Sequence, residues 1–274
     1  MPLAIFMPAE GIAMSPIDRW AHANRWRRLH PLQKTVFAAA LGGSAFVFPT
    51  PVAAMIPVIA GLFLRYGAGI PVRAFLRFMA LPLSFLSLGA IPLLVQVQPS
   101  GFSLVWSMDG IPGWWIGVNG EGVRTAVTVW VRALAVTSSM YVLALTTPVP
   151  DLVDMLRRVN VPEILLEVMH LMYRYLFILM EMAQQTYVAQ SSRLGYQSWS
   201  RSLSSLGRLG AALAVKSRLE VEDLHRALIS RGYRGRLTVL PPPWAVCLKT
   251  AAWMGAAVVG LAVAAWLVGR RLHG

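Results

Sequence analysis

The stretch TVFAAALGGSAFVFPTPVAAMIPVIAGLFL, residues 35–64, contains no charged side chain, and neither do residues 78–108, 133–150 and 250–269. A helix needs about 20 consecutive apolar residues to cross the hydrocarbon core of a membrane, so several of these stretches are long enough. The whole chain of 274 residues is 56% hydrophobic and 14% charged, whereas soluble domains carry about 25% charged residues. The sequence therefore predicts an all-α, polytopic membrane protein with about five to six membrane helices.

Two prolines interrupt the first of these stretches, in the sequence FPTP at residues 48–51. Proline lacks a backbone N–H and clashes with the preceding turn, so it kinks or ends a helix. Each half of the stretch would form a helix of about 20 Å at 1.5 Å per residue, which is short for a full crossing. The sequence favours two short, tilted helices that meet at a turn over one kinked helix.

The charged residues divide the chain into four regions. Residues 1–34 are expected to form a basic cytosolic segment, residues 35–150 the N-terminal membrane helices, residues 151–240 amphipathic and cytosolic coupling helices, and residues 241–274 the final membrane helix and tail. Residues 98–121 contain two carboxylates and neither lysine nor arginine, which makes them the external loop, because basic residues favour the cytosolic side. The net charge of +13 thus indicates membrane orientation and not nucleic-acid binding.

Three helices can be placed within these regions. A span is predicted over residues 122–145 and carries Arg132, which should face the helix bundle or a polar cavity, because an arginine deep in lipid is costly. Residues 151–162 predict a short amphipathic helix ended by Pro162, and residues 163–190 predict a long helix with mixed faces.

Two short elements of similar form lie in the basic region that follows. SSRLGY at residues 191–196 and ISRGYRG at residues 229–235 each place an arginine after a serine and close to a glycine and a tyrosine. Gly232 is well placed to end a helix whose last turn carries Arg231, since glycine commonly adopts the left-handed conformation just past a helix. Each element is therefore expected to end a helix near an exposed arginine.

Small residues recur at helical spacing between the two elements. This spacing predicts a helix with one smooth face, which lets a second helix cross closely. The acidic residues that follow the small ones are expected to begin a turn. The small residues are Gly207, Gly210, Ala211 and Ala214, and the acidic residues are Glu220, Glu222 and Asp223. The region as a whole predicts two closely crossing amphipathic helices.

Arginine on such a helix suits a protein partner with an acidic groove, because its planar guanidinium binds carboxylates through two hydrogen bonds. Basic amphipathic helices beside a membrane can also lie on anionic lipid. The residues by themselves leave both interpretations open, and the paired Ser-Arg elements favour docking to a protein.

The block IDRWAHANRWRRLHPLQK, residues 17–34, and the two Ser-Arg elements resemble the T component of energy-coupling factor (ECF) transporters, specifically the cobalt-type CbiQ group. The block is similar to the N-terminal block of Asp, Asn, Arg, His-Pro and Lys in that group. The group also has two Ala-Arg-Gly signatures, and here serine replaces alanine in both and leucine replaces glycine in the first, with Gly195 one place later. The signatures map onto Ser192, Arg193 and Leu194, and onto Ser230, Arg231 and Gly232.

The resemblance implies a multi-pass scaffold in a bacterial inner membrane, with cytoplasmic coupling helices. Such a T component joins two ATP-binding cassette ATPase subunits to a CbiM-like substrate-binding membrane subunit, possibly with a CbiN-like subunit. Arg193 and Arg231 would seat in grooves of the ATPases, and ATP-driven closure would move the helices, tilt the substrate subunit and release cobalt or nickel inward. The chain itself would be no enzyme and bind no cofactor directly, with ATP hydrolysed by the partner subunits.

Several absences in the sequence agree with that expectation. The chain has no GxxxxGK[ST] phosphate loop, and its five histidines lack carboxylate or cysteine partners at ligand spacing, so no metal site is predicted. The single cysteine, Cys247, excludes an internal disulfide. Three alternatives remain: the T component of a vitamin transporter, the substrate-binding subunit itself, which needs a ligand constellation, and a polytopic membrane enzyme, which needs clustered carboxylates.

Overall fold

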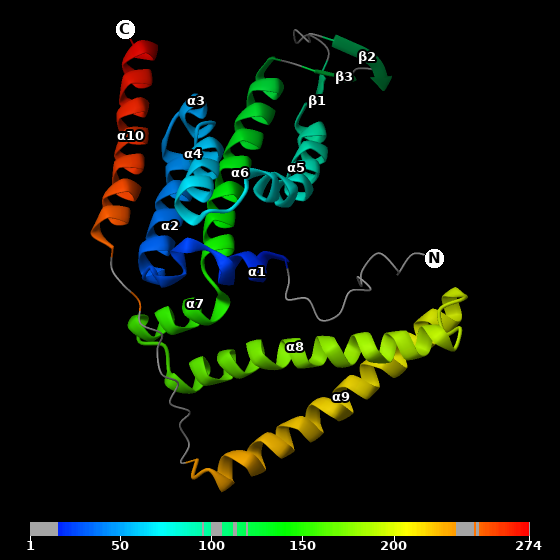
Figure 1. The fold of residues 1–274 in the computed structure, drawn as a ribbon. Coiled ribbons are helices and arrows are strands. Elements are labelled where there is room, and N and C mark those ends of the chain that lie inside the picture. Colours follow the sequence, from blue (N-terminus) through cyan, green and yellow to red (C-terminus); the bar gives the residue numbers. More distant parts are fainter. Residues whose placement is uncertain are drawn as a thin grey trace. The chain divides into compact units, whose positions relative to one another are not determined.

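A computed structural model of the chain describes residues 16–94, 96–99, 106–111, 114–118, 120–233, 244 and 247–273. The chain forms two compact units (Figure 1). We call residues 20–148 with 243–274 the membrane unit, and residues 1–19 with 149–242 the arm unit.

The membrane unit is built from helices that pack around α6. Its elements are η1 (Arg25–Arg28), α2 (Pro31–Val47), α3 (Thr50–Ala53), α4 (Ile56–Leu62), the π-helical η2 (Phe63–Ala68), α5 (Val72–Leu94), α6 (Gly120–Thr146) and α10 (Leu248–His273), and α1 (Pro16–Ala23) leads into them. Both α2 and α5 pack against α6.

Four described segments are long and apolar enough to cross a membrane: Thr50–Ala68, Val72–Leu94, Gly120–Thr146 and Leu248–Arg270. The helix α2, with 17 residues, is about 26 Å long at 1.5 Å per residue. If α2 is counted as a membrane helix too, the described residues contain five, which is the lower end of the predicted five to six. The predicted all-helical, polytopic membrane class is confirmed, and the span expected over residues 122–145 is found in α6.

The break in the first apolar stretch lies where the prolines predict it. Helix α2 ends at Val47, the N–H of Phe48 still donates to the carbonyl of Ser44 at 3.0 Å, and Pro49 is the N-cap of the next helix, α3. Two helices that meet at a turn are therefore confirmed over one kinked helix.

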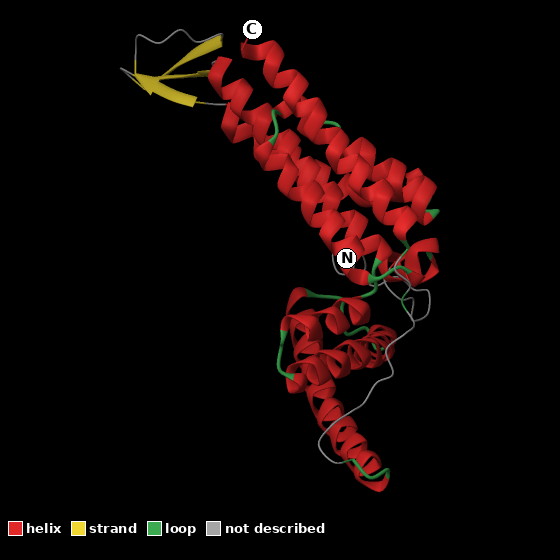
Figure 2. Ribbon diagram, turned by 90° about the vertical axis from the view of Figure 1, so that its left-hand side faces the viewer, coloured by secondary structure: helices red, strands yellow, loops and turns green. Residues whose placement is uncertain are grey.

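A small antiparallel sheet connects α5 and α6 in the stretch that the sequence assigns to the external loop. Its strands are β1 (Gln96–Pro99), β2 (Trp106–Ile111) and β3 (Trp114–Val118), in the order β1-β3-β2. Figure 2 shows this sheet in yellow beside the ends of these two helices. No pattern in the sequence predicted these strands.

The core of the membrane unit lies between α2 and α6. Ala135, Ser138 and Val142 of α6 are fully buried, as are Leu41 and Ala45 of α2. Small side chains at such a contact let two helix backbones approach closely. This packing fixes α6 as the central helix of the unit.

The arm unit contains α7 (Val149–Leu156), η3 (Arg157–Val159), α8 (Glu163–Ser192) and α9 (Trp199–Ser230). A short helix is confirmed in this stretch, but it ends before Pro162, which is instead the N-cap of α8. The long helix predicted from residue 163 is confirmed. Helices α8 and α9 meet at a tight turn and diverge from it (Figure 1), so their close contact is limited to the region of that turn.

The turn expected at Glu220, Glu222 and Asp223 is wrong, because all three residues lie inside the continuous helix α9. Ion pairs along the helix explain why it continues. Glu222 accepts from Arg218 at 3.3 Å, and Asp223 lies 3.6 Å from Arg226. Opposite charges three or four residues apart are neighbours on the surface of a helix, and their attraction stabilises it.

Candidate functional site

The two Ser-Arg elements form the C-terminal ends of α8 and α9. Each helix ends at the serine, Ser192 or Ser230, and the arginine that follows, Arg193 or Arg231, is its C-cap residue. We call residues 190–195 the first cap and residues 228–233 the second cap.

The two caps have the same hydrogen-bond pattern. In the first cap the N–H of Gly195 donates to the carbonyl of Gln190 at 2.9 Å, and the N–H of Leu194 donates to that of Ser191 at 3.0 Å. In the second cap Tyr233 donates to Leu228 at 3.0 Å and Gly232 to Ile229 at 2.9 Å. Paired bonds of this kind, from the second and first residues past the cap, define the Schellman motif. The two signatures thus fold into two copies of one backbone structure.

The third residue of each signature is left-handed. The angle φ is +60° at Leu194 and +77° at Gly232. Glycine adopts this conformation at little steric cost, whereas another L-residue pays roughly 1–2 kcal/mol. The replacement of glycine by Leu194 therefore leaves the backbone of the first cap unchanged and puts strain into it.

Gly195, the displaced glycine of the first signature, has a different task. A Cβ at this position would lie 2.8 Å from Oγ of Ser205 and 2.9 Å from the carbonyl oxygen of Gln190. The buried Ser205 of α9 donates through that Oγ to the carbonyl of Gly195 at 2.9 Å. Position 195 requires a glycine because α9 approaches the end of α8 closely there.

Tyr196 braces the same turn. Its hydroxyl donates to Oε1 of Gln190 at 2.6 Å, and its ring centroid lies 4.7 Å from that of Tyr187. Burial, and secondarily repulsion from Tyr187, raise the pKa of Tyr196. The phenol therefore stays protonated near neutral pH and remains a hydrogen-bond donor.

The arginines are the groups that each cap presents outward. Ser192 donates to the carbonyl of Val188 and Ser230 to that of Ala227, both at 2.9 Å, so both hydroxyls are used within their own helices. Arg193 and Arg231 are exposed. Within the described part of the chain, neither guanidinium forms an ion pair.

The small residues of α9, predicted to pack against a second helix, lie on its surface. Gly207, Gly210, Ala211 and Ala214 are all exposed, and a Cβ at either glycine would meet no atom within 4 Å. They share one side of the helix with exposed apolar residues, Trp199, Leu203 and Val221 among them. We call this side the open face of α9. It has no packing partner among the described residues of the arm unit, so the predicted helix crossing is not made there.

The N-terminal block holds the end of α6. Nζ of Lys34, which is fully buried, donates to the carbonyl of Thr146 at 2.9 Å, and Nδ2 of Asn24 lies 3.2 Å from the same oxygen. His30 caps α2 by accepting from the N–H of Leu32 at 3.1 Å, with Pro31 in the first turn. His30 thus forms the entry to α2, and the block fixes α6 just before the chain enters the arm unit.

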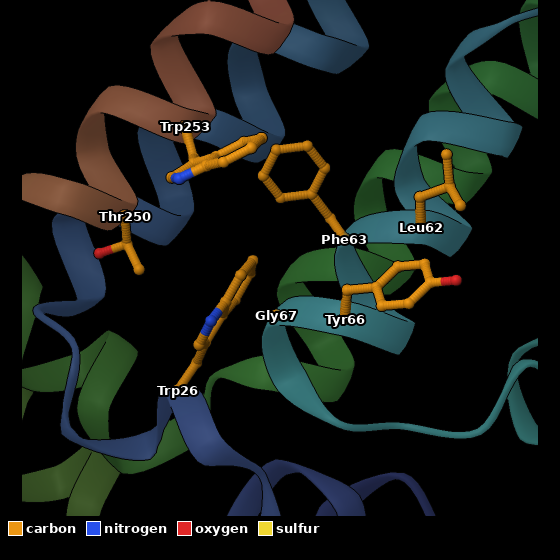
Figure 3. A pocket seen from close by; sticks show the side chains of 7 residues that line it. All are labelled: Trp26, Leu62, Phe63, Tyr66, Gly67, Thr250 and Trp253. Atoms are coloured by element: carbon orange, nitrogen blue, oxygen red, sulfur yellow. The ribbon is translucent and has the colours of Figure 1, made fainter.

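An apolar cavity that no sequence pattern predicted lies between η2 and α10. It measures about 410 Å³ and is lined by Trp26, Leu62, Phe63, Tyr66, Gly67, Thr250 and Trp253 (Figure 3). A Cβ on Gly67 would overlap the Trp26 ring, so that glycine lets the ring lie against η2. No local pattern connects these two residues, because the tryptophan lies in the basic N-terminal block and the glycine is 41 residues further along the chain.

The described residues hold no group of three or more His, Cys, Asp or Glu arranged for a metal ion. The nearest approach to such a group in the arm unit is a pair, with Nε2 of His170 3.4 Å from Oδ1 of Asp154. This pair joins α7 to α8, which is a structural task.

Comparison with known proteins identifies the family. The model of the family described as CbiQ, cobalt transport protein, matches residues 22–241. A cobalt transport protein CbiQ of Rhodobacter capsulatus is 34% identical over 230 residues, covering 84% of this chain and 88% of the relative. The protein of the same name from Salmonella typhimurium is 31% identical over 227 residues, covering 81% and 98%. A putative fused cobalt transport protein CbiMQ of Methanocorpusculum labreanum is 28% identical over 163 residues, covering 60% of this chain and 27% of the relative.

The match includes both caps, the open face of α9 and most of the N-terminal block. Its described residues include four apolar helices of spanning length, and the chain belongs to the CbiQ family of cobalt transport proteins, as a membrane component.

Proposed function

We propose that this chain is the energy-coupling T component of an ECF-type importer for cobalt or nickel ions. The observation that supports this role is the pair of matching caps, each with an exposed arginine at the same backbone position. One backbone structure presented twice fits two copies of one kind of partner groove. Two ATP-binding cassette ATPase subunits, each with an acidic groove, are such partners.

Each docked arginine would bind carboxylates through the fork of its guanidinium. The serine hydroxyls and the cap N–H groups are already hydrogen-bonded within the chain. The guanidinium is therefore the charged group that each cap offers to a partner. In this role Ser192, Leu194, Ser230 and Gly232 shape the cap, and Arg193 and Arg231 make the contact.

The long helices of the arm unit would carry the motion. Helices α8 and α9 contain 30 and 32 residues, which is about 45 and 48 Å at 1.5 Å per residue. The Ser205–Gly195 hydrogen bond and the ring of Tyr196 tie them at their shared turn. Closure of the ATPase pair on ATP would shift both caps, and helices of this length would move as levers on the cytoplasmic side.

The open face of α9 would receive the substrate-binding membrane subunit. Its exposed apolar residues and small residues offer a surface along which another helix can pack closely and slide. The fused CbiMQ relative supports a CbiM-like partner, because fusion places two functions in one chain. The transported ion would be held by that partner, and ATP would be bound and hydrolysed by the ATPases, so this chain needs no cofactor and no catalytic group of its own.

The test is co-purification of the full chain with its ATPase partner. Reversing the charge at both caps, Arg193→Glu with Arg231→Glu, should abolish association, since breaking a buried ion pair costs roughly 3–5 kcal/mol. The matched control is Arg208→Glu, an exposed arginine of α9 outside both caps, which should leave association unchanged.

Normal ATPase stoichiometry in the double variant would contradict the proposal. The competing interpretation, an arm that lies on anionic lipid, predicts instead that all three charge reversals weaken binding to vesicles about equally. It also predicts no specific loss of the ATPase at the caps.

A further inference from the structure

The apolar cavity beside η2 continues along α10. A second cavity of about 360 Å³ shares Leu62, Phe63 and Trp253 with the first and extends along α10 to Ala264. We call the two together the apolar groove. It follows α10 from Thr250 to Ala264, which is about 21 Å at 1.5 Å per residue. That length exceeds half the roughly 30 Å hydrocarbon core.

The residues of the groove explain its form. Ala256, Ala257 and Gly260 leave α10 narrow on this side, and a Cβ at Gly260 would meet no atom within 4 Å. At the other end two aromatic side chains are open to the surroundings, with Trp253 73% and Tyr66 77% exposed. Tryptophan and tyrosine are enriched where a membrane meets water. Figure 3 shows Trp253, Phe63 and Trp26 around the cavity at this aromatic end.

Basic residues flank the lining of the aromatic end of the groove in the sequence. Trp26 lies between two arginines in the sequence, Tyr66 follows an arginine and Thr250 follows a lysine. No aspartate or glutamate occurs in residues 20–94 or 244–274, the two segments that form the groove. The flanking basic residues are all exposed: Arg25, Arg27, Arg65 and Lys249.

We infer that the apolar groove binds one anionic phospholipid, with an acyl chain along α10 and the phosphate among these basic side chains. An apolar channel whose aromatic end is flanked in the sequence by four basic residues, with no carboxylate in either segment, offers both chemistries that such a lipid needs. Basic pockets between membrane helices bind anionic head groups for the same reason. Each cavity has a volume in the range of small-molecule sites, about 300–1,000 Å³. A helix of a partner subunit, with a diameter of about 10–12 Å, would need more room than this.

Native mass spectrometry of the full chain, taken from micelles with equal amounts of phosphatidylglycerol and phosphatidylcholine, tests the site. The chain should retain one phosphatidylglycerol in preference to phosphatidylcholine. Gly260→Phe fills the groove and should abolish this retention. The matched control, Gly89→Phe, changes an equally open and exposed glycine of α5 and should leave it intact.

The head-group contact has its own variant. Arg65→Gln with Lys249→Gln should lower the preference for phosphatidylglycerol about fivefold per residue, while one lipid is still retained through the groove. The inference would be overturned if the wild-type chain retained both lipids equally. It would also be overturned if Gly260→Phe retained phosphatidylglycerol as the wild-type chain does. Loss of a membrane partner subunit in Gly260→Phe, with lipid retention preserved, would overturn it in favour of a protein helix in the groove.

Discussion

The first cap and the second cap reach one backbone structure by different means. Both make the same pair of Schellman hydrogen bonds, and both have a left-handed residue after the arginine. The second cap uses glycine at that position, and a Cβ on Gly232 would have no neighbour within 4 Å. The first cap uses Leu194 and is held by contacts with α9 through Ser205. One cap is therefore specified locally and the other by tertiary contacts.

The difference shows why a signature can lose its glycine and keep its fold. A non-glycine residue at positive φ persists where surrounding structure stabilises it. The turn between α8 and α9 supplies such contacts through Gly195, Ser205 and Tyr196. The free end of α9 has no such contacts among its described residues, so its glycine is needed. Three substitutions test this contrast.

The largest effect is expected for Gly195→Ala. The added Cβ would collide with Oγ of Ser205 and with the backbone oxygen of Gln190, and such overpacking costs about 1–3 kcal/mol. Hydrogen exchange of amides in residues 186–206 should accelerate. Gly210→Ala in open space on α9 is the control and should slow exchange slightly, because alanine favours a helix by about 1 kcal/mol over glycine. Unchanged exchange in Gly195→Ala would show that the turn does not depend on this close approach.

A smaller effect is expected for Gly232→Ala. No atom obstructs the new methyl group, so the cost comes from the left-handed backbone and is about 1–2 kcal/mol. Exchange should accelerate in residues 226–233 and stay the same in the first cap. Acceleration in both caps would mean that their stabilities are coupled, against the independence that we expect.

The smallest effect, and one of opposite sign, is expected for Leu194→Gly. Glycine removes the strain at φ +60°, and its greater freedom in the unfolded chain offsets part of the gain, leaving at most about 1 kcal/mol. Leu194 is 57% exposed, so little buried apolar surface is lost. Slower exchange in the first cap should result. Faster exchange would show that the leucine side chain, and not the α8–α9 contacts, stabilises this cap.

Much of the fold could be predicted from local patterns in the sequence. Charge-free stretches predicted the spans, FPTP predicted the break between α2 and α3, and Gly232 predicted the end of α9. The prediction of a turn at Glu220–Asp223 was wrong, because a cluster of acidic residues is compatible with two structures. Such residues can begin a turn, or they can pair with Arg218 and Arg226 along a helix, as they do here.

The candidate site was predictable in part. Both arginines were assigned to helix ends from the Ser-Arg pattern, and both lie there. The left-handed conformation of Leu194 could not be predicted, since leucine rarely adopts it and its stabilising contacts come from residue 205. The apolar groove was equally hidden, because segments about 190 residues apart in the chain form it through side-chain shape alone.

The sequence by itself determined the membrane class of this protein, the order of its helices and the two exposed arginines at helix ends. These follow from composition, periodicity and the conformational preferences of proline and glycine, all of which act over a few neighbouring residues. Only the tertiary structure decided that the two signatures share one backbone, that Lys34 holds the end of α6 and that a groove opens along α10. Such features depend on which distant atoms come into contact, and a local pattern contains no information on that.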